Sequence, residues 1–152
     1  MNLCLKEINY KKLNAKAKTP LYGSEQAAGL DLCAVIDNDS DGYIVLPGET
    51  VKIRTGIAIE IPEGYFGAIF ARSGLATKQG LRPANCVGVI DSDYRGEVIV
   101  AIHNDSDCSR VITTGDRIAQ LVIMPYMHVN LHETEELSDT KRGDGGFGST
   151  GN

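Results

Sequence analysis

Apolar residues recur at every second position over long stretches, and this alternation constrains the fold more than any other feature of the chain. In the longest run the alternating positions carry Val51, Ile53, Thr55, Ile57, Ile59 and Ile61. The side chains between them include Lys52, Arg54 and Glu60, so one face of the segment suits a core and the other suits water. The pattern predicts a half-buried β-strand with a bend at Gly56.

Similar but shorter runs occur at residues 98–102 and 127–131, and turn-forming residues separate the runs from one another. Turns are expected at 47–48, 62–64, 104–107 and 114–116. Many short strands at close spacing are typical of a sandwich, a jelly roll or a barrel, whose strands are mostly antiparallel. The sequence therefore predicts an all-β fold.

Helical character is confined to residues 73–79, where Ser73 is the expected N-cap and Gly80 the expected stop. Beyond residue 133 the strand pattern gives way to acidic and polar residues, and then to glycine. We expect a single β domain at residues 1–135. A flexible, glycine-rich C-terminal arm is expected at residues 136–152.

The bulk composition excludes several classes of protein. A chain of 152 residues with 42% hydrophobic and 23% charged residues is expected to form one globular domain. Its net charge of -5 argues against nucleic-acid binding, which needs a basic surface. No apolar stretch reaches the ~20 residues of a membrane span, and the N-terminus does not resemble a secretion signal. We therefore expect a soluble, cytoplasmic protein with no nucleic-acid or membrane partner.

Cysteines and histidines do not form a recognisable metal-binding pattern. The cysteines stand at Cys4, Cys33, Cys86 and Cys108. This spacing is too wide for a zinc site or a CxxC motif, and we expect buried or half-buried thiols. His128 and His132 would lie ~13 Å apart on an extended strand, so we expect them to be surface residues.

Polar residues at two strand ends are candidates for chemistry, each beside a simpler interpretation. Arg72, Ser73 and Gly74 precede the short helix, whose N-terminus suits an anion, although an ordinary N-cap explains the same residues. Asp91 and Asp93 follow an apolar strand and are either plain turn residues or a candidate general base.

A further candidate pair, Arg117 and Gln120, follows a turn on another predicted strand. Their odd separation predicts opposite faces, so we expect one of them to be structural while the other reaches a ligand. The residue types do not decide which.

The glycine-rich end of the chain allows two interpretations. Its unshielded N–H groups suit phosphate oxygens, and Arg142 adds a cation. Residues 143–150 superficially resemble a P-loop, but Ser149 stands at the lysine position and no helix is expected to follow, which argues against a Walker-type site. The segment is either a solvated tail or an arm in which Phe147 stacks on a base.

Taken together and in order, five segments resemble the five motifs of the deoxyuridine triphosphatase (dUTPase) family. They are residues 28–31 (AGLD), 72–74 (RSG), 88–96 (GVIDSDYRG), 115–120 (GDRIAQ) and 142–150 (RGDGGFGST). The resemblance extends from about residue 16 to residue 151. Each motif is weakly specific by itself, but the ordered set is very specific.

The resemblance implies hydrolysis of dUTP to dUMP and pyrophosphate by attack of water on the α-phosphorus, which keeps uracil out of DNA and supplies dUMP for thymidylate synthesis. Asp91 matches the general base, and Tyr94 matches the ring that packs against deoxyribose. The uracil pocket matches Asn85, Val89, Ile90 and Ile99, on the hairpin that carries the third motif. The phosphate contacts match Arg72, Ser73, Gly74 and Gln120. In the arm, Arg142 matches a residue that contacts the γ-phosphate. The residues that cover the nucleotide in the family correspond here to Phe147, Gly148 and Ser149.

The same resemblance implies a jelly-roll subunit in a homotrimer whose active sites each draw segments from three chains. It also implies Mg²⁺ carried mainly on the substrate phosphates, with Asp31 holding waters of that ion. This agrees with the reluctance of Mg²⁺ to lose its waters and its use of phosphate ligands.

Three other functions account for the sequence less well than the hydrolase. A deoxycytidine triphosphate deaminase shares the fold, but Asp91, Tyr94 and the complete arm fit the hydrolase better. A nucleotide-binding protein without activity would not need Asp91. A structural jelly-roll protein would leave Tyr94 and the arm unexplained.

Overall fold

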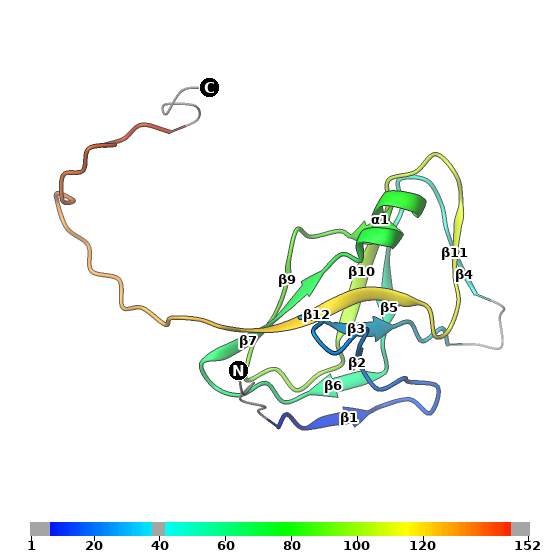
Figure 1. The fold of residues 1–152 in the computed structure, drawn as a ribbon. Coiled ribbons are helices and arrows are strands. Elements are labelled where there is room, and N and C mark those ends of the chain that lie inside the picture. Colours follow the sequence, from blue (N-terminus) through cyan, green and yellow to red (C-terminus); the bar gives the residue numbers. More distant parts are fainter. Residues whose placement is uncertain (1–6, 38–41, 147–152) are drawn as a thin grey trace.

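The computed structural model describes residues 7–37 and 42–146, which form antiparallel sheets and one short helix (Figure 1). In chain order the elements are β1 (Tyr10–Lys12), β2 (Leu21–Tyr22), β3 (Leu30–Cys33), β4 (Tyr43–Val45), β5 (Thr50–Arg54), β6 (Ile57–Ile59), β7 (Tyr65–Phe70), α1 (Ser73–Gln79), β8 (Leu81–Pro83), β9 (Gly88–Ile90), β10 (Ile99–Asn104), β11 (Arg110–Ile112) and β12 (Arg117–Pro125). The predicted all-β fold with one short helix is confirmed.

Neighbouring strands come from distant parts of the chain, as in a jelly roll. The largest sheet has the order β2-β3-β12-β7-β9, and a second sheet has the order β5-β10-β8. Two further pairs, β1-β6 and β11-β4, complete the arrangement, and every one of these pairings is antiparallel. β12 lies at the centre of the largest sheet, with β3 on one side and β7 on the other.

The long alternating run forms two strands, β5 and β6, which are separated by a bend at Gly56 as predicted. Gly56 has φ 67°, and a Cβ at this position would lie 2.7 Å from the Cβ of Ala17. Both the left-handed backbone and the close approach therefore demand glycine. The alternating side chains on either side of it, from Val51 to Ile61, are buried, so the predicted core face is confirmed.

The short helix ends as expected but begins differently. Gly80 has φ 68°, and its N–H donates to the carbonyl of Ala76, which is the predicted stop. Ser73 is the first helical residue rather than the N-cap. The cap is Arg72, which makes no side-chain capping bond. Its extended backbone offers its carbonyl to the N–H of Ala76, while its side chain is bound elsewhere.

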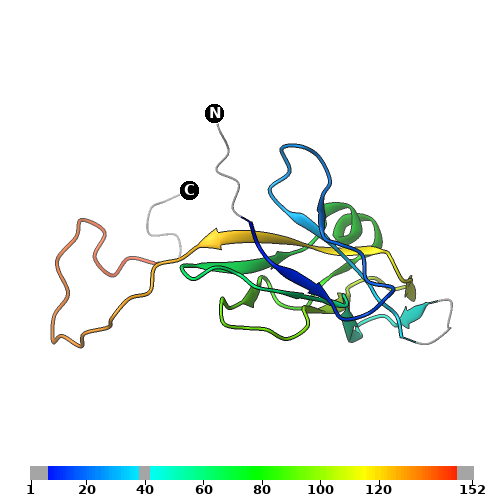
Figure 2. The same cartoon turned by 90° about the horizontal axis from the view of Figure 1, so that it is seen from below.

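The strand predicted at residues 127–131 is absent, which corrects the sequence-based expectation. β12 ends at Pro125, opposite Tyr65, the first residue of β7. Past this pair the described chain offers no strand to accept further ladder bonds, and residues 127–146 run alone, away from the sheets (Figures 1 and 2). Met127, Val129 and Leu131 are consequently 85%, 58% and 91% exposed.

Thiol burial also differs from the expectation. Cys33, on β3, is half-buried, and burial raises the pKa of its thiol. Cys86 and Cys108 are exposed because both lie in loops rather than on the inner face of a strand. Cys4 lies outside the described residues. Among the described residues no helix is long and apolar enough to cross a membrane.

A buried asparagine at the end of β10 joins β4 to the loop that follows β10. The side chain of Asn104 is 0% exposed, and its amide nitrogen donates to the carbonyls of Val45 and Cys108, at 3.0 and 2.9 Å. Its amide oxygen accepts from the N–H and the hydroxyl of Ser106. All its polar atoms are therefore paired, which is the condition for burying an amide without cost.

Replacing Asn104 by aspartate keeps the shape of the side chain but removes both donors. At neutral pH we expect Asn104→Asp to lower the free energy of unfolding by about 3–5 kcal/mol, because it buries an uncompensated charge against two carbonyls. Denaturant unfolding measures this. Gln26→Glu, at an exposed position in a turn, is the control and should stay within about 0.5 kcal/mol. Equal effects at both positions would contradict this role for the buried amide.

Candidate functional site

The largest sheet, β2-β3-β12-β7-β9, brings three of the predicted segments side by side. Gln120 on β12 is paired with Asp31 on β3 and with Phe70 on β7. Gly29 lies next to them, and a Cβ there would be 3.1 Å from the Cβ of Gln120. The glycine therefore leaves the room that the glutamine side chain occupies. Because β7 leads directly into α1, the candidates at residues 72–74 lie at the same end of the sheet.

Asp31 is the centre of this cluster and is almost fully buried, at 7% exposure. One carboxylate oxygen accepts from Nε of Arg72 at 2.9 Å, and the other accepts from Nη1 of Arg117 at 3.1 Å. Arg72 also donates from Nη1 to the backbone carbonyl of Arg117, at 3.4 Å. Two guanidinium groups around one carboxylate leave a local excess of positive charge, in a chain whose net charge is -5.

The expected placement of Arg117 and Gln120 on opposite faces is wrong. The register of β12 against β3 shifts between Arg117 and Ala119, which marks a β-bulge. A bulge inserts one residue and resets the alternation of side chains. Arg117 consequently reaches Asp31, the residue paired with Gln120. Both side chains belong to one cluster.

The start of α1 adds exposed groups to this cluster. Ser73 and Gly74 are both exposed, and nothing lies within 4 Å of a Cβ built at Gly74. Their N–H groups are among those that a helix leaves without an internal partner. Together with the arginines they form a cationic, donor-rich surface, which suits the oxygens of a phosphate chain.

The other candidates lie on a loop that follows β9. Asp91 and Tyr94 are exposed, and the turn between them is closed by the N–H of Tyr94 donating to the carbonyl of Asp91. The Tyr94 hydroxyl donates to the carbonyl of Glu97, and the ring lies over Gly96, where a Cβ would be 2.4 Å from the hydroxyl oxygen. Gly96 is therefore needed to hold the ring in this position.

Two charged side chains fix the base of this loop. Glu97 accepts from Nε of Arg54 at 2.9 Å and from the N–H of Gly56 at 2.7 Å. Arg95 donates to the carbonyls of Ser92 and Tyr94 within the loop itself. The loop is thus anchored to the β5-β6 connection and has an ordered turn that presents the Asp91 carboxylate.

The residues expected in a base pocket lie next to this loop. Asn85, Val89 and Ile99 are exposed, and Ile90 is half-buried. They do not form the two-stranded hairpin that was expected, because β9 pairs with β7 whereas β10 pairs with β5 and β8. The residues between β9 and β10, 91–98, therefore form a loop that connects the two sheets.

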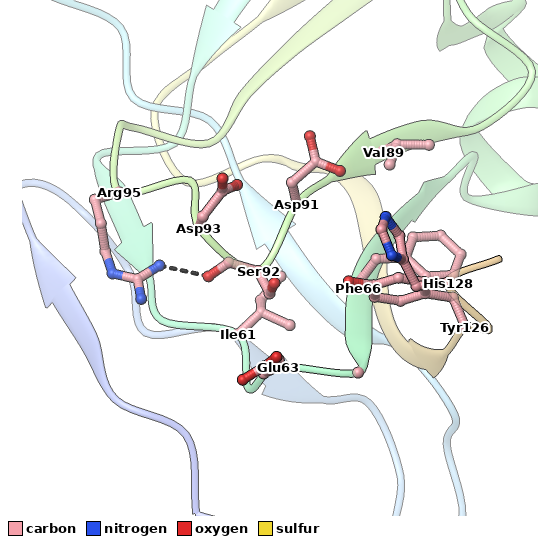
Figure 3. A pocket seen from close by; sticks show the side chains of 11 residues that line it. Ile61, Glu63, Phe66, Val89, Asp91, Ser92, Asp93, Arg95, Tyr126 and His128 are labelled. Atoms are coloured by element: carbon pink, nitrogen blue, oxygen red, sulfur yellow. Dashed lines mark hydrogen bonds between the residues drawn. The ribbon is translucent and has the colours of Figure 1, made fainter. Parts of the chain in front are cut away.

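Asp91 and Asp93 line an open cavity of about 1070 Å³ whose opposite wall is aromatic (Figure 3). Phe66 and Tyr126 meet edge to face with their centroids 6.4 Å apart, and Tyr126 meets His128 in the same way at 6.5 Å. Neither Phe66 nor Tyr126 was among the residues expected at a site from the sequence. Their only signal was aromatic character at the ends of strands that turn out to be neighbours.

A single chain does not bring Asp91 and the arginine cluster together. Asp91 follows Ile90, which is paired with Gly67 near the start of β7, whereas Arg72 follows the end of β7. At 3.2–3.4 Å per residue, the length of this strand separates them by roughly 15–20 Å. Within the single chain the Asp91 carboxylate is exposed.

The arm candidates are only partly described. Arg142 is exposed, and its Nε donates to the carbonyl of Gly145, so within one chain its side chain bonds to the arm itself. Phe147, Gly148 and Ser149 lie outside the described residues. Among the described residues no group of three or more metal-ligating side chains occurs.

Comparison with known proteins identifies close relatives over the whole chain. The family model named dUTPase matches residues 15–151. A deoxyuridine 5'-triphosphate nucleotidohydrolase of Desulfitobacterium hafniense is 48% identical over 152 residues, covering 99% of each chain. A protein of the same name from a Hydrogenobaculum species is 50% identical over 141 residues, covering 93% of this chain and 95% of the relative.

Solved structures agree with these relatives. The dUTPase of Staphylococcus bacteriophage 80alpha with dUpNHpp matches with a TM-score of 0.84 at 30% identity, covering 97% of this chain and 99% of that one. The dUTPase from phage phi11 of S. aureus matches with a TM-score of 0.77 at 28% identity, covering 89% and 100%. The resemblance seen in the five ordered motifs is confirmed, and the chain belongs to the dUTPase family.

Proposed function

We propose that this chain hydrolyses dUTP to dUMP and pyrophosphate, with Asp91 as the general base. In this reaction a water oxygen forms a bond to the α-phosphorus while the bond to the α,β-bridging oxygen breaks. The proton released by the water passes to the Asp91 carboxylate, and pyrophosphate leaves with the bonding electron pair. Such a base contributes on the order of 10²- to 10⁴-fold to a rate.

The proposal rests on one observation: the candidate residues form two groups, and these groups lie at opposite ends of β7. The arginine cluster at one end suits a triphosphate, and the loop with Asp91 and Tyr94 at the other suits a nucleoside and a water. Because one chain holds them roughly 15–20 Å apart, a complete site requires the loop of one subunit to face the arginine cluster of another. This supports the shared active site of a homotrimer.

The exposed apolar side chains after β12 support the same assembly. Met127 and Leu131 are almost fully exposed, and the alternation that predicted a strand here finds no partner strand among the described residues. Apolar side chains in this arrangement are typical of a surface that another chain covers. A neighbouring subunit would supply that cover.

Tyr94 gives a physical basis for selecting deoxyribose. Its ring is held by the bond from its hydroxyl to the Glu97 carbonyl and by contact with Gly96. A fixed ring against the sugar leaves no space for a 2′-hydroxyl. The backbone and side chain of the loop from Asn85 to Ile90 would select uracil by shape and by paired polar groups.

The carboxylate of Asp31 suits a Mg²⁺ ion that binds together with the triphosphate. Asp31 offers one carboxylate, which keeps further lone pairs beyond those used by the two arginines, so it would hold waters of the ion rather than the ion directly. When bound, Mg²⁺ would neutralise charge on the phosphate chain. Arg72, Ser73, Gly74 and Gln120 would contact the phosphates themselves. A cytoplasmic location stays a prediction.

The first test separates Asp91 from its neighbour. We expect Asp91→Asn to lower kcat for dUTP by on the order of 10²- to 10⁴-fold, because the amide cannot accept the proton of the water. Asp93→Asn is the matched control, since it is exposed on the same loop, and it should retain most of the activity. Pyrophosphate release from dUTP, dTTP, dCTP and UTP is measured. Wild-type protein that is folded but inactive on dUTP would refute the proposal.

The second test addresses the shared site. Asp91→Asn and Arg72→Ala proteins, each nearly inactive, are unfolded together and refolded as a mixture. If each site takes Asp91 and Arg72 from different chains, random trimers restore about one quarter of wild-type activity, because that fraction of sites combines both intact residues. Sites built within one chain would contain one defect each, and the mixture would stay inactive.

The third test concerns the arm. Truncation before Arg142 should leave the fold and the trimer intact, because the described residues beyond this point make no ladder bonds to the sheets. Turnover should fall by about 100-fold, as expected for loss of a cationic contact to the phosphates. Sedimentation and thermal unfolding serve as the controls. A truncated chain that dissociates or unfolds would show that the arm is structural.

A further inference from the structure

Arg117 belongs to the ion-pair cluster around Asp31 but has no assigned part in the proposed reaction. Both oxygens of the buried carboxylate bind a guanidinium group, Arg72 on one side and Arg117 on the other. The exposed fractions of the three side chains differ sharply, at 9% for Asp31, 24% for Arg72 and 55% for Arg117. The cluster is therefore anchored at the carboxylate and opens to solvent towards Arg117.

The carboxylate has a fixed position because its strand is paired on both sides. Asp31 is opposite Gln120 on β12 and opposite Leu21 on β2. An aspartate side chain has few rotatable bonds. Because β3 lies between two other strands, the backbone of Asp31 also has little freedom. Asp31 can thus serve as a rigid point from which other side chains are oriented.

Arg72 is oriented by two contacts that both involve Asp31 or Arg117. Its Nε binds the carboxylate, and its Nη1 binds the backbone carbonyl of Arg117. The guanidinium carries five donors, so Nη2 and part of Nη1 stay available for a ligand. The Nε edge of the Arg72 guanidinium is therefore fixed, while Nη2 stays available to bind a ligand.

The β-bulge in β12 is what makes this geometry possible. By resetting the alternation between Arg117 and Ala119, it turns Arg117 towards Asp31 and aims its carbonyl at Arg72. Bulges commonly re-aim a side chain beside an active site. Without the extra residue, Arg117 would point to the other face of the sheet.

We propose that Arg117 is a positioning residue, which acts through Asp31 and its own carbonyl to hold the Arg72 guanidinium in the orientation that the phosphate chain requires. This inference rests on the proposed function, since Arg72 must contact phosphate for its orientation to matter. In this role Arg117 acts through its bonds to Asp31 and Arg72. A misplaced Arg72 contact weakens binding of the transition state more than binding of the substrate, so the effect falls mainly on kcat.

A double-mutant cycle tests the proposal. Arg117→Ala, Arg72→Ala and the double variant are compared with wild type, with kcat and KM for dUTP measured at high enzyme concentration. Arg117→Ala should lower kcat by about 10- to 100-fold with a smaller change in KM. In the Arg72→Ala background the same substitution should change kcat/KM by less than about threefold, because the group that it positions is already gone.

Controls separate this effect from loss of charge or of folding. Arg110→Ala removes a half-buried arginine of β11 whose side chain binds only Ser106 in the described structure, and it should leave kcat unchanged. Arg117→Lys repeats the cycle with a side chain that keeps the charge, in case Arg117→Ala lowers stability. Thermal unfolding of every variant confirms that the measured protein is folded.

The outcomes are distinguishable from failure of the proposed function. If folded wild type does not hydrolyse dUTP, the proposed function fails and the cycle is not reached. If wild type is active but Arg117→Ala and Arg72→Ala multiply in the double variant, Arg117 acts on the substrate directly and the positioning role is wrong. An unchanged kcat in folded Arg117→Ala would overturn it as well.

Discussion

The pairing of β12 with β3 on one side and β7 on the other is the interaction on which the rest of the site depends. Through these two ladders Gln120 lies beside Asp31 and Phe70, although the three residues are far apart in the sequence. The backbone hydrogen bonds fix the register, and the register fixes which side chains meet. A shift by one residue in the ladder between β12 and β3 would send Asp31 and Gln120 to different faces and disperse the cluster.

The same sheet also explains why one chain is incomplete. β7 carries β9 and the Asp91 loop near its beginning, and it passes into the helix with Arg72 at its end. A strand is stiff, so Asp91 and the arginine cluster cannot approach each other within the chain. The proposed trimer resolves this by placing the end of one subunit's strand opposite the loop of another. In the proposed trimer, sharing of the site would follow from the length of β7.

Much of this could be predicted from the sequence because it depends on local rules. The alternation from Val51 to Ile61 identified a core face, and Gly56 and Gly80 marked a bend and a helix end through their left-handed backbones. The predictions failed where a distant partner decides the outcome. Residues 127–131 have the alternation of a strand but no neighbour in the described chain.

The sequence by itself determined the all-β class, the core face of the long run from Val51 to Ile61 and, through five ordered motifs, the family. These properties follow from side-chain periodicity, from the backbone freedom of glycine, and from residue types that chemistry requires in a fixed order. Only the tertiary structure decided that Arg117 joins Asp31 and Arg72, and that Asp91 lies at the opposite end of β7. A bulge and a ladder register arise from hydrogen bonds between distant segments, and no local pattern encodes them.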